Sequence, residues 1–161
     1  MSQKQLVKRL TDCSLKTELG EFKMFVYGDA EGKEHVALVK GKVEKKKSLP
    51  CRVHSSCLAG EAFHATTCSC HKELMASMKL CQDEGSGIVI YLNQHGGGGG
   101  ISSFVKQMKE GSLSSDKRNY QIAAEILRDL KVKSVRLMTD NPQKVKQLKR
   151  YGVKVVETIS S

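Results

Sequence analysis

The sequence predicts a mixed α/β domain with a mixed sheet, in which an N-terminal antiparallel hairpin precedes alternating strands and helices. Near the N-terminus, apolar and polar residues alternate on both sides of the turn-forming GDAEGK segment, as is typical of a β-hairpin. Further along, short apolar runs alternate with segments whose apolar residues recur at helical spacing, as in α/β proteins. The chain of 161 residues is long enough for one domain with its own core, so we expect residues 1–161 to form a single domain.

The first half of the chain is expected to contain the hairpin, one short strand and one helix. Residues 22–27 should pair with residues 35–40, and the CRVHSSC segment (51–57) is strand-like. A helix is expected to begin just after Cys70, and its dipole would help to lower the pKa of the thiols of Cys68 and Cys70. The helical spacing is carried by Leu74, Met75, Met78 and Cys81.

The second half is expected to alternate strands with helices. The apolar run at 88–92 follows two glycines and predicts a strand that is covered on both faces. A helix with a long apolar face comes next, capped by Asp116 or by the serines before it, and a buried strand follows at 134–138. Asn141 and Pro142 should open the last helix, and residues 153–157 should form the last strand. The apolar face consists of Ile122, Ala123, Ile126, Leu127 and Leu130.

The bulk composition places the protein in a reducing compartment. The polar N-terminus does not resemble a signal peptide, and no apolar run reaches the ~18 residues that a membrane span needs, so we expect a cytoplasmic protein with no membrane partner. In such a compartment, clustered thiols are metal ligands or reactive groups rather than disulfides. The isolated Cys13, Cys51 and Cys81 are expected to be small buried hydrophobic residues.

The net charge of +10 indicates an anionic partner or a strongly solvated surface. Aromatic residues are sparse and do not alternate with lysines, so a nucleic-acid partner is not expected, and phosphorylated small molecules remain. The basic residues gather in a loop and along the predicted last helix: Lys40, Lys42, Lys45, Lys46 and Lys47, then Lys144, Lys146, Lys149 and Arg150.

Cys57, Cys68 and Cys70 form the most specific motif, with the spacing C-x10-C-x-C. Three thiolates and one open position, filled by water, are typical of a catalytic zinc site. A fourth ligand would instead close the site and make the zinc structural. Spacing alone leaves both alternatives open, since three histidines lie nearby in the sequence: His54, His64 and His71.

Three further segments could contact a phosphate. The glycine-rich run 94–101 exposes backbone amides, although such a run is as often a flexible loop. Thr139 and Lys144 stand where a predicted strand leads into a helix, where an anion could bind, although an ordinary capped helix start explains the same residues. Asp116 could orient Arg118, or could cap the following helix while Arg118 stays solvated.

Taken together and in order, these motifs resemble the GTP cyclohydrolase II family along nearly the whole chain. The similarity is carried by EHVALVKG (34–41), RVHSSCLAGEAF (52–63), CSC (68–70), EGSGIVIYLNQ (84–94), DKRNYQIAAEILRDL (116–130) and RLMTDNPQKV (136–145). The resemblance implies a zinc ion that activates water to attack C8 of the guanine ring of GTP. It also implies release of formate and pyrophosphate in the first step of riboflavin biosynthesis, Mg²⁺ on the triphosphate, and a homodimer.

The resemblance assigns roles residue by residue. Cys57, Cys68 and Cys70 match the zinc ligands. Asp116 and Arg118 match the pair implicated in attack at the α-phosphate and in pyrophosphate release. The positions that contact the nucleotide phosphates are matched by Arg52, Thr139 and Lys144.

The chain departs from the family pattern in several places. Where the family typically has RQEGRGIGL, this chain has NQHGGGGGI, so His95 and Gly97 replace an acid and an arginine. The segment that follows is shorter and lacks both the catalytic tyrosine and the residues that recognise the guanine edge. A glutamine after the last cysteine has become Glu73. We therefore expect a zinc-dependent enzyme of this type or, as the alternative, a catalytically impaired relative that binds a phosphorylated ligand or a protein partner.

Overall fold

A computed structural model describes residues 4–111 and 118–160, and it confirms the predicted mixed α/β class. The strands are β1 (Val7–Thr17), β2 (Gly20–Asp29), β3 (Glu34–Lys40), β4 (Leu49–Ser55), β5 (Gly87–Leu92), β6 (Val135–Met138) and β7 (Val155–Ile159). The helices are α1 (Leu58–Glu61), α2 (Cys70–Glu84), the 3-10 helix η1 (His95–Gly98), α3 (Ile101–Glu110), α4 (Gln121–Asp129) and α5 (Pro142–Arg150).

The strands form one seven-stranded sheet with an antiparallel half and a parallel half. The strand order is β1-β2-β3-β5-β4-β6-β7, and β2 pairs with β3 as the hairpin that the sequence predicts. From β5 onward, β4 pairs in parallel with both β5 and β6, and β6 pairs in parallel with β7. The sequence did not predict β1, because most of its side chains are exposed and leave no alternating apolar pattern.

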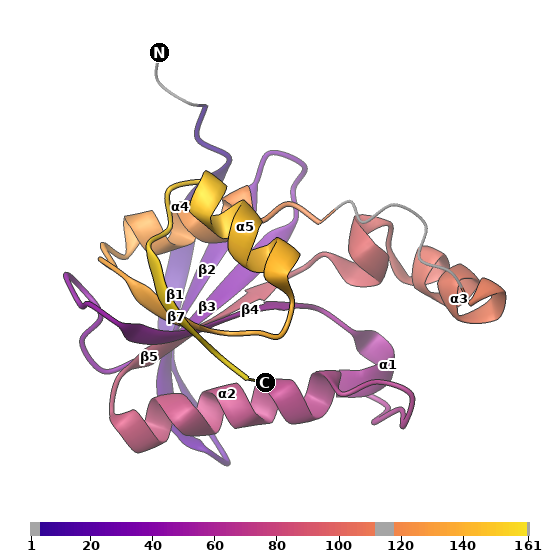
Figure 1. The fold of residues 1–161 in the computed structure, drawn as a ribbon, viewed down its shortest axis with the longest axis horizontal. Coiled ribbons are helices and arrows are strands. Elements are labelled where there is room, and N and C mark those ends of the chain that lie inside the picture. Colours follow the sequence, from indigo (N-terminus) through magenta and orange to yellow (C-terminus); the bar gives the residue numbers. More distant parts are fainter. Residues whose placement is uncertain (1–3, 112–117, 161) are drawn as a thin grey trace.

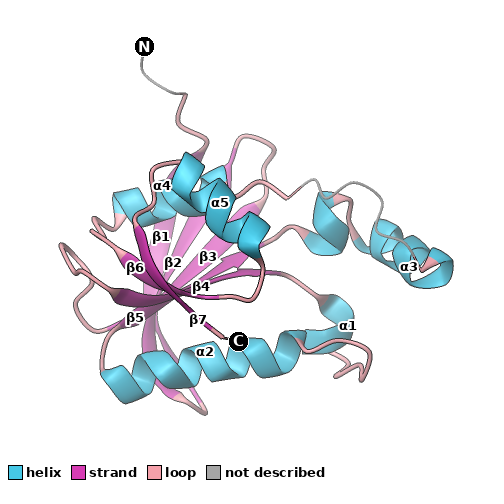
Figure 2. Ribbon diagram, in the orientation of Figure 1, coloured by secondary structure: helices cyan, strands magenta, loops and turns pink. Residues whose placement is uncertain are grey.

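Helices cover both faces of the sheet, with α2 on one side and α4 and α5 on the other (Figure 1). The α2 side is the smaller core, in which Met78 and Cys81 pack against Phe22, Leu38 and Val89. The larger core lies under α4 and α5 and contains the predicted apolar face of α4. Helix α3 projects from the side of the molecule (Figure 2). Within residues 4–111 and 118–160, no helix combines the length and apolar character needed to cross a bilayer.

Two helix starts show how local sequence set the boundaries. Asn141 caps α5 as predicted, since its side chain accepts the N–H of Gln143 at 3.0 Å and Pro142 follows it. The predicted cap of α4 was wrong: the N-cap is Tyr120, and the side chain of Asn119 accepts the N–H of Gln121. Asp116 itself lies outside the described residues.

The three isolated cysteines do not behave alike. Cys51 and Cys81 are fully buried, as the sequence predicts. Cys13 is exposed, so the prediction that it is a buried residue was wrong. The reason is its place in β1, an edge strand of the sheet in which most side chains are exposed.

Candidate functional site

The carboxyl ends of β4 and β6 meet the N-termini of α2 and α5 around a cavity of about 360 Å³. This edge of a parallel sheet is where ligands of α/β proteins characteristically bind. We call the cavity the anion pocket because of the cations on its walls. It is lined by Arg52, His54, Ser55, Cys70, Glu73, Arg118, Thr139, Asp140, Asn141 and Lys144.

The three predicted metal ligands form a compact group beside this pocket. Cys57 directly precedes α1, Cys70 begins α2, and Cys68 lies two residues earlier. Their sulfur atoms all lie within 4.8 Å of one another, and those of Cys57 and Cys68 are 3.9 Å apart. Two sulfurs on a tetrahedral zinc, each at about 2.3 Å, would be about 3.8 Å apart, so the group fits zinc.

No histidine belongs to this group among the described residues. Among residues 4–111 and 118–160, the ligand atoms of His, Cys, Asp and Glu that gather within 4.8 Å in a group of three or more are these three sulfurs alone. His54 is instead held by Glu61, and the rings of His64 and His71 lie against each other with centroids 4.1 Å apart. This arrangement favours the open, three-sulfur alternative over the closed structural one.

Burial, and the hydrogen bonds and charges of the neighbouring thiols of Cys57 and Cys68, raise the pKa of the Cys70 thiol. The sequence had predicted the opposite direction from the dipole of α2. Burial of the thiol is the largest cause of the observed direction, ahead of the contacts with the two neighbouring thiols. Three thiolates at this spacing therefore require a cation among them.

Arg52 and Lys144 form the buried cationic wall of the anion pocket. The guanidinium of Arg52 donates to the carbonyl oxygen of Met138 at 2.9 Å. The ammonium of Lys144 donates to the carbonyl oxygen of Val53 at 2.9 Å. Burial, with the nearby charges of Arg52 and Arg118, lowers the pKa of Lys144 to about 8. Because Arg52 and Lys144 are both buried and the charge of Arg52 disfavours the charged form of Lys144, an anion between them would be favoured.

The structure brings most of the predicted site residues to this one place. Arg52, Thr139, Lys144 and Arg118 all line the anion pocket, and Cys70 joins it to the thiol group. Asp116 lies outside the described residues. The roles assigned to these residues stay predictions.

Sequence reasoning missed a network that connects the pocket to the thiol group. Glu61 binds the side chains of His54 and Tyr91 and also accepts the N–H of Cys57 at 3.3 Å. Burial acts to raise the pKa of Glu61, but the hydrogen bonds from His54 and Tyr91 outweigh it and lower that pKa. The sequence contained only a slight indication of this network, namely that the carboxylate of Glu61 follows Cys57 by four residues.

The structure offers no support for the predicted phosphate contact of the glycine-rich run. The chain turns into η1 and then α3 there, and Gly98 borders a different cavity. His95 accepts the N–H of Leu58 at 2.7 Å, at the start of α1. This contact holds the segment beside the thiol group instead of over the anion pocket.

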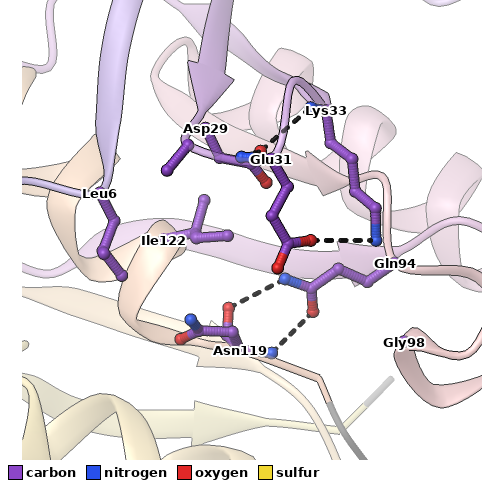
Figure 3. A pocket seen from close by; sticks show the side chains of 9 residues that line it. Leu6, Asp29, Glu31, Lys33, Gln94, Gly98, Asn119 and Ile122 are labelled. Atoms are coloured by element: carbon purple, nitrogen blue, oxygen red, sulfur yellow. Dashed lines mark hydrogen bonds and ion pairs between the residues drawn. The ribbon is translucent and has the colours of Figure 1, made fainter.

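Another cavity, of about 330 Å³, lies between the β2–β3 turn and the start of α4 (Figure 3). Its polar side chains bind the protein itself. The amide of Gln94 exchanges two hydrogen bonds with the backbone of Asn119, and Lys33 pairs with Glu31 at 3.8 Å. The anion pocket differs in its buried cations and in its contact with the thiol group through Cys70, so we take it as the candidate site.

Comparisons with known proteins agree on one family. A family model described as GTP cyclohydrolase II matches residues 8–160. A GTP cyclohydrolase-2 from Neisseria gonorrhoeae is 35% identical over 168 aligned residues, which cover 96% of this chain and 85% of that protein. The riboflavin biosynthesis protein RibBA of Cytophaga hutchinsonii is 35% identical over 173 aligned residues, or 99% of this chain and 43% of that protein.

Among solved structures, RibBX of A. baumannii, a two-domain 3,4-dihydroxy-2-butanone 4-phosphate synthase, resembles the chain with a TM-score of 0.67. The two are 21% identical, and the match covers 98% of this chain and 41% of that one, so it bears on the fold alone. The chain spans less than half the length of the RibBA relatives that it matches.

Proposed function

The chain belongs to the GTP cyclohydrolase II family, and from this premise we propose that it is a zinc-dependent hydrolase of that type. It would open the imidazole ring of GTP, or of a related purine nucleotide, and release formate and pyrophosphate. This reaction would be the first step of riboflavin biosynthesis. We also propose that Mg²⁺ accompanies the nucleotide phosphates and that the protein works as a homodimer in the cytoplasm.

One observation supports this proposal more than any other. Cys70 belongs to the thiol group and also lines the anion pocket. A nucleotide held by its phosphates on Arg52 and Lys144 would therefore lie next to the metal centre. Chemistry at the base and binding of the phosphates would share one site.

Cys57, Cys68 and Cys70 would hold the zinc ion, since their sulfur spacing fits it. A bound zinc with an open position supplies a Lewis acid and lowers the pKa of a coordinated water to about 7. Glu61 would keep the first ligand in place, because its carboxylate accepts the N–H of Cys57.

The chain's own residues would bind the phosphates and promote loss of pyrophosphate. Arg52 and Lys144 would bind phosphate oxygens as buried cations, and Thr139 would contact them at the edge of the pocket. We propose that Arg118 and Asp116 act at the α-phosphate and in the release of pyrophosphate. The position of Arg118 on the pocket wall supports its part of this proposal.

The direct test incubates zinc-loaded protein with GTP and Mg²⁺ and measures formate and pyrophosphate. We expect both products, with one zinc per chain coordinated by three sulfurs and one lighter atom in X-ray absorption. The Cys68→Ser variant should lose zinc and activity, whereas Cys13→Ser, a change at an exposed cysteine of β1, should lose neither. Zinc-loaded protein that releases neither product would contradict the proposed reaction.

One observation favours the alternative of a family member that binds a phosphorylated ligand without turnover. The guanidinium of Arg52 already contacts Met138, His54 and Glu73, so substrate phosphates must compete for it. Calorimetry with a panel of nucleotides separates the two functions. Nucleotide binding without formate release supports the binder, and turnover excludes it.

A further inference from the structure

The carboxylate of Glu73 lies on the anion-binding side of Arg52, inside the anion pocket. Its Oε2 accepts from Nη2 of Arg52 at 2.7 Å, and its Oε1 accepts from the hydroxyl of Ser69 at 3.0 Å. Ser69 and Glu73 belong to the first turn of α2, with Ser69 as the N-cap residue. These two hydrogen bonds therefore place the carboxylate where a phosphate oxygen would otherwise meet the guanidinium.

The two partners of this ion pair differ in their access to water. The side chain of Arg52 is 7% exposed, whereas that of Glu73 is 26% exposed. The carboxylate can therefore turn towards solvent, while the guanidinium stays in the pocket. A phosphate that binds Arg52 must displace the carboxylate or remain beside it.

The carboxylate of Glu73 changes the charge balance of the pocket. Its walls carry the cations Arg52, Arg118 and Lys144, and the carboxylates Glu73 and Asp140. Glu73 offsets one of the three cations before any ligand arrives. The repulsion between Glu73 and a ligand grows with the ligand's negative charge, and the partly buried site screens it less than water would.

We propose that Glu73 is a specificity-determining residue, a resident anion on Arg52 that disfavours polyphosphate ligands relative to ligands with a single phosphate group. The inference rests on the proposed function, because it takes the pocket to be the phosphate site. Removing this one charge shifts the preference of the pocket towards the more highly charged ligand.

The test measures the binding of inorganic phosphate and pyrophosphate by calorimetry, at low salt and without divalent cations. The Glu73→Gln variant keeps the shape of the side chain and an oxygen acceptor for Arg52 but removes the charge. We expect it to bind pyrophosphate on the order of tenfold more tightly than the unchanged protein, after allowance for solvent screening. The gain for inorganic phosphate should be smaller.

Two control variants separate this effect from others. Asp83→Asn removes the same charge from the exposed end of α2, where Asp83 pairs with Lys79, and should change both affinities less than twofold. Glu73→Asp keeps the charge and should bind pyrophosphate as weakly as the unchanged protein does. Circular dichroism checks folding, and Glu73→Ala removes the same charge if Glu73→Gln does not fold.

The outcomes are distinguishable. Tighter pyrophosphate binding by Glu73→Gln, but not by Asp83→Asn or Glu73→Asp, supports the inference. Equal pyrophosphate affinity in all the variants overturns it and leaves the phosphate pocket standing. Equal gains for phosphate and pyrophosphate also overturn it, because the effect would not depend on ligand charge. Absence of anion binding in every variant overturns the proposed pocket together with the inference.

Discussion

Gly60 lies where any side chain would collide with the thiol of Cys68, one of the three clustered thiols. A Cβ atom added there would lie 2.6 Å from the sulfur of Cys68 and 3.5 Å from that of Cys57. Contacts below about 3 Å force neighbouring atoms to move, and a metal site tolerates little displacement of its ligands. The thiol group thus depends on a residue that carries no ligand atom.

We predict that Gly60→Ala lowers zinc affinity by at least about tenfold, measured by competition with a chelator of known affinity. Gly28→Ala is the matched control. The three atoms nearest to its Cβ would all belong to the side chain of Leu10, the closest at 3.1 Å, and that side chain is half exposed and can move. Unchanged zinc affinity in Gly60→Ala would show that the thiols do not bind the metal in this arrangement.

Lys144 makes anion binding depend on pH. Burial, together with the charges of Arg52 and Arg118, lowers its pKa to about 8, so the ammonium is charged below that pH and loses its proton above it. The unfolded chain keeps the proton up to about pH 10.5. Between these values the unfolded state binds more protons, so the contribution of Lys144 to the free energy of unfolding rises with pH.

Binding has the opposite sign, because an anion prefers the protonated lysine. We predict that sulfate, whose charge stays constant in this range, binds about threefold to tenfold more weakly at pH 9 than at pH 7. Lys144→Met should bind sulfate weakly at both pH values. Calorimetry at the two pH values measures the affinity for sulfate. An affinity that stays constant in the unchanged protein would show that Lys144 does not bind the anion.

At the scale of elements, α3 and α4 show that an amphipathic pattern does not reveal what a helix contacts. Both helices carry a continuous apolar face. Ile126 of α4 is fully buried in the larger core, whereas Ile101, Val105 and Met108 of α3 are about half exposed. The difference lies in position, since α4 lies on the sheet and α3 projects from it (Figure 1).

This difference predicts unequal effects of similar truncations. Ile126→Ala should lower the free energy of unfolding by about 2–5 kcal/mol, because it opens a cavity in the core. Met108→Ala should change it by less than about 0.5 kcal/mol. Urea unfolding measures both. A large loss in Met108→Ala would show that the apolar face of α3 is covered in solution.

At the scale of the whole molecule, polar contacts join the two halves of the sheet. The carboxylate of Glu125, in α4, accepts the N–H groups of Leu6 at 2.7 Å and Val7 at 3.3 Å. Nearby, the carboxylate of Asp129 accepts from Arg9 of β1 and from the hydroxyl of Tyr27 of β2. The antiparallel half is thereby fixed to a helix of the parallel half, more than a hundred residues away.

We predict that Glu125→Ala lowers the free energy of unfolding by about 1–3 kcal/mol, because buried N–H groups lose their acceptor. The amides of Leu6 and Val7 should also exchange with solvent faster. Glu18→Ala, at an exposed carboxylate, is the control and should have little effect. Unchanged exchange at Leu6 and Val7 would contradict the role given to Glu125.

The sequence by itself determined the α/β class, the hairpin and the helices α2, α4 and α5, because these depend on local periodicity and capping. The apolar run of β5 and the Asn141-Pro142 start of α5 are clear in single segments of chain. The cysteine spacing indicated the metal ligands for a similar reason. Two of them are separated by one residue, and the third is the last residue of the strand-like segment 51–57.

The tertiary structure alone decided what the site residues touch. Arg52 meets Glu73 across 21 residues, and its carbonyl partner Met138 lies 86 residues away. Local sequence could not reveal these pairs, since strand order, and not chain order, brings β4, β6 and α2 to one edge of the sheet. The exposure of Cys13 differed from prediction because it depends on the position of β1 at an edge of the sheet.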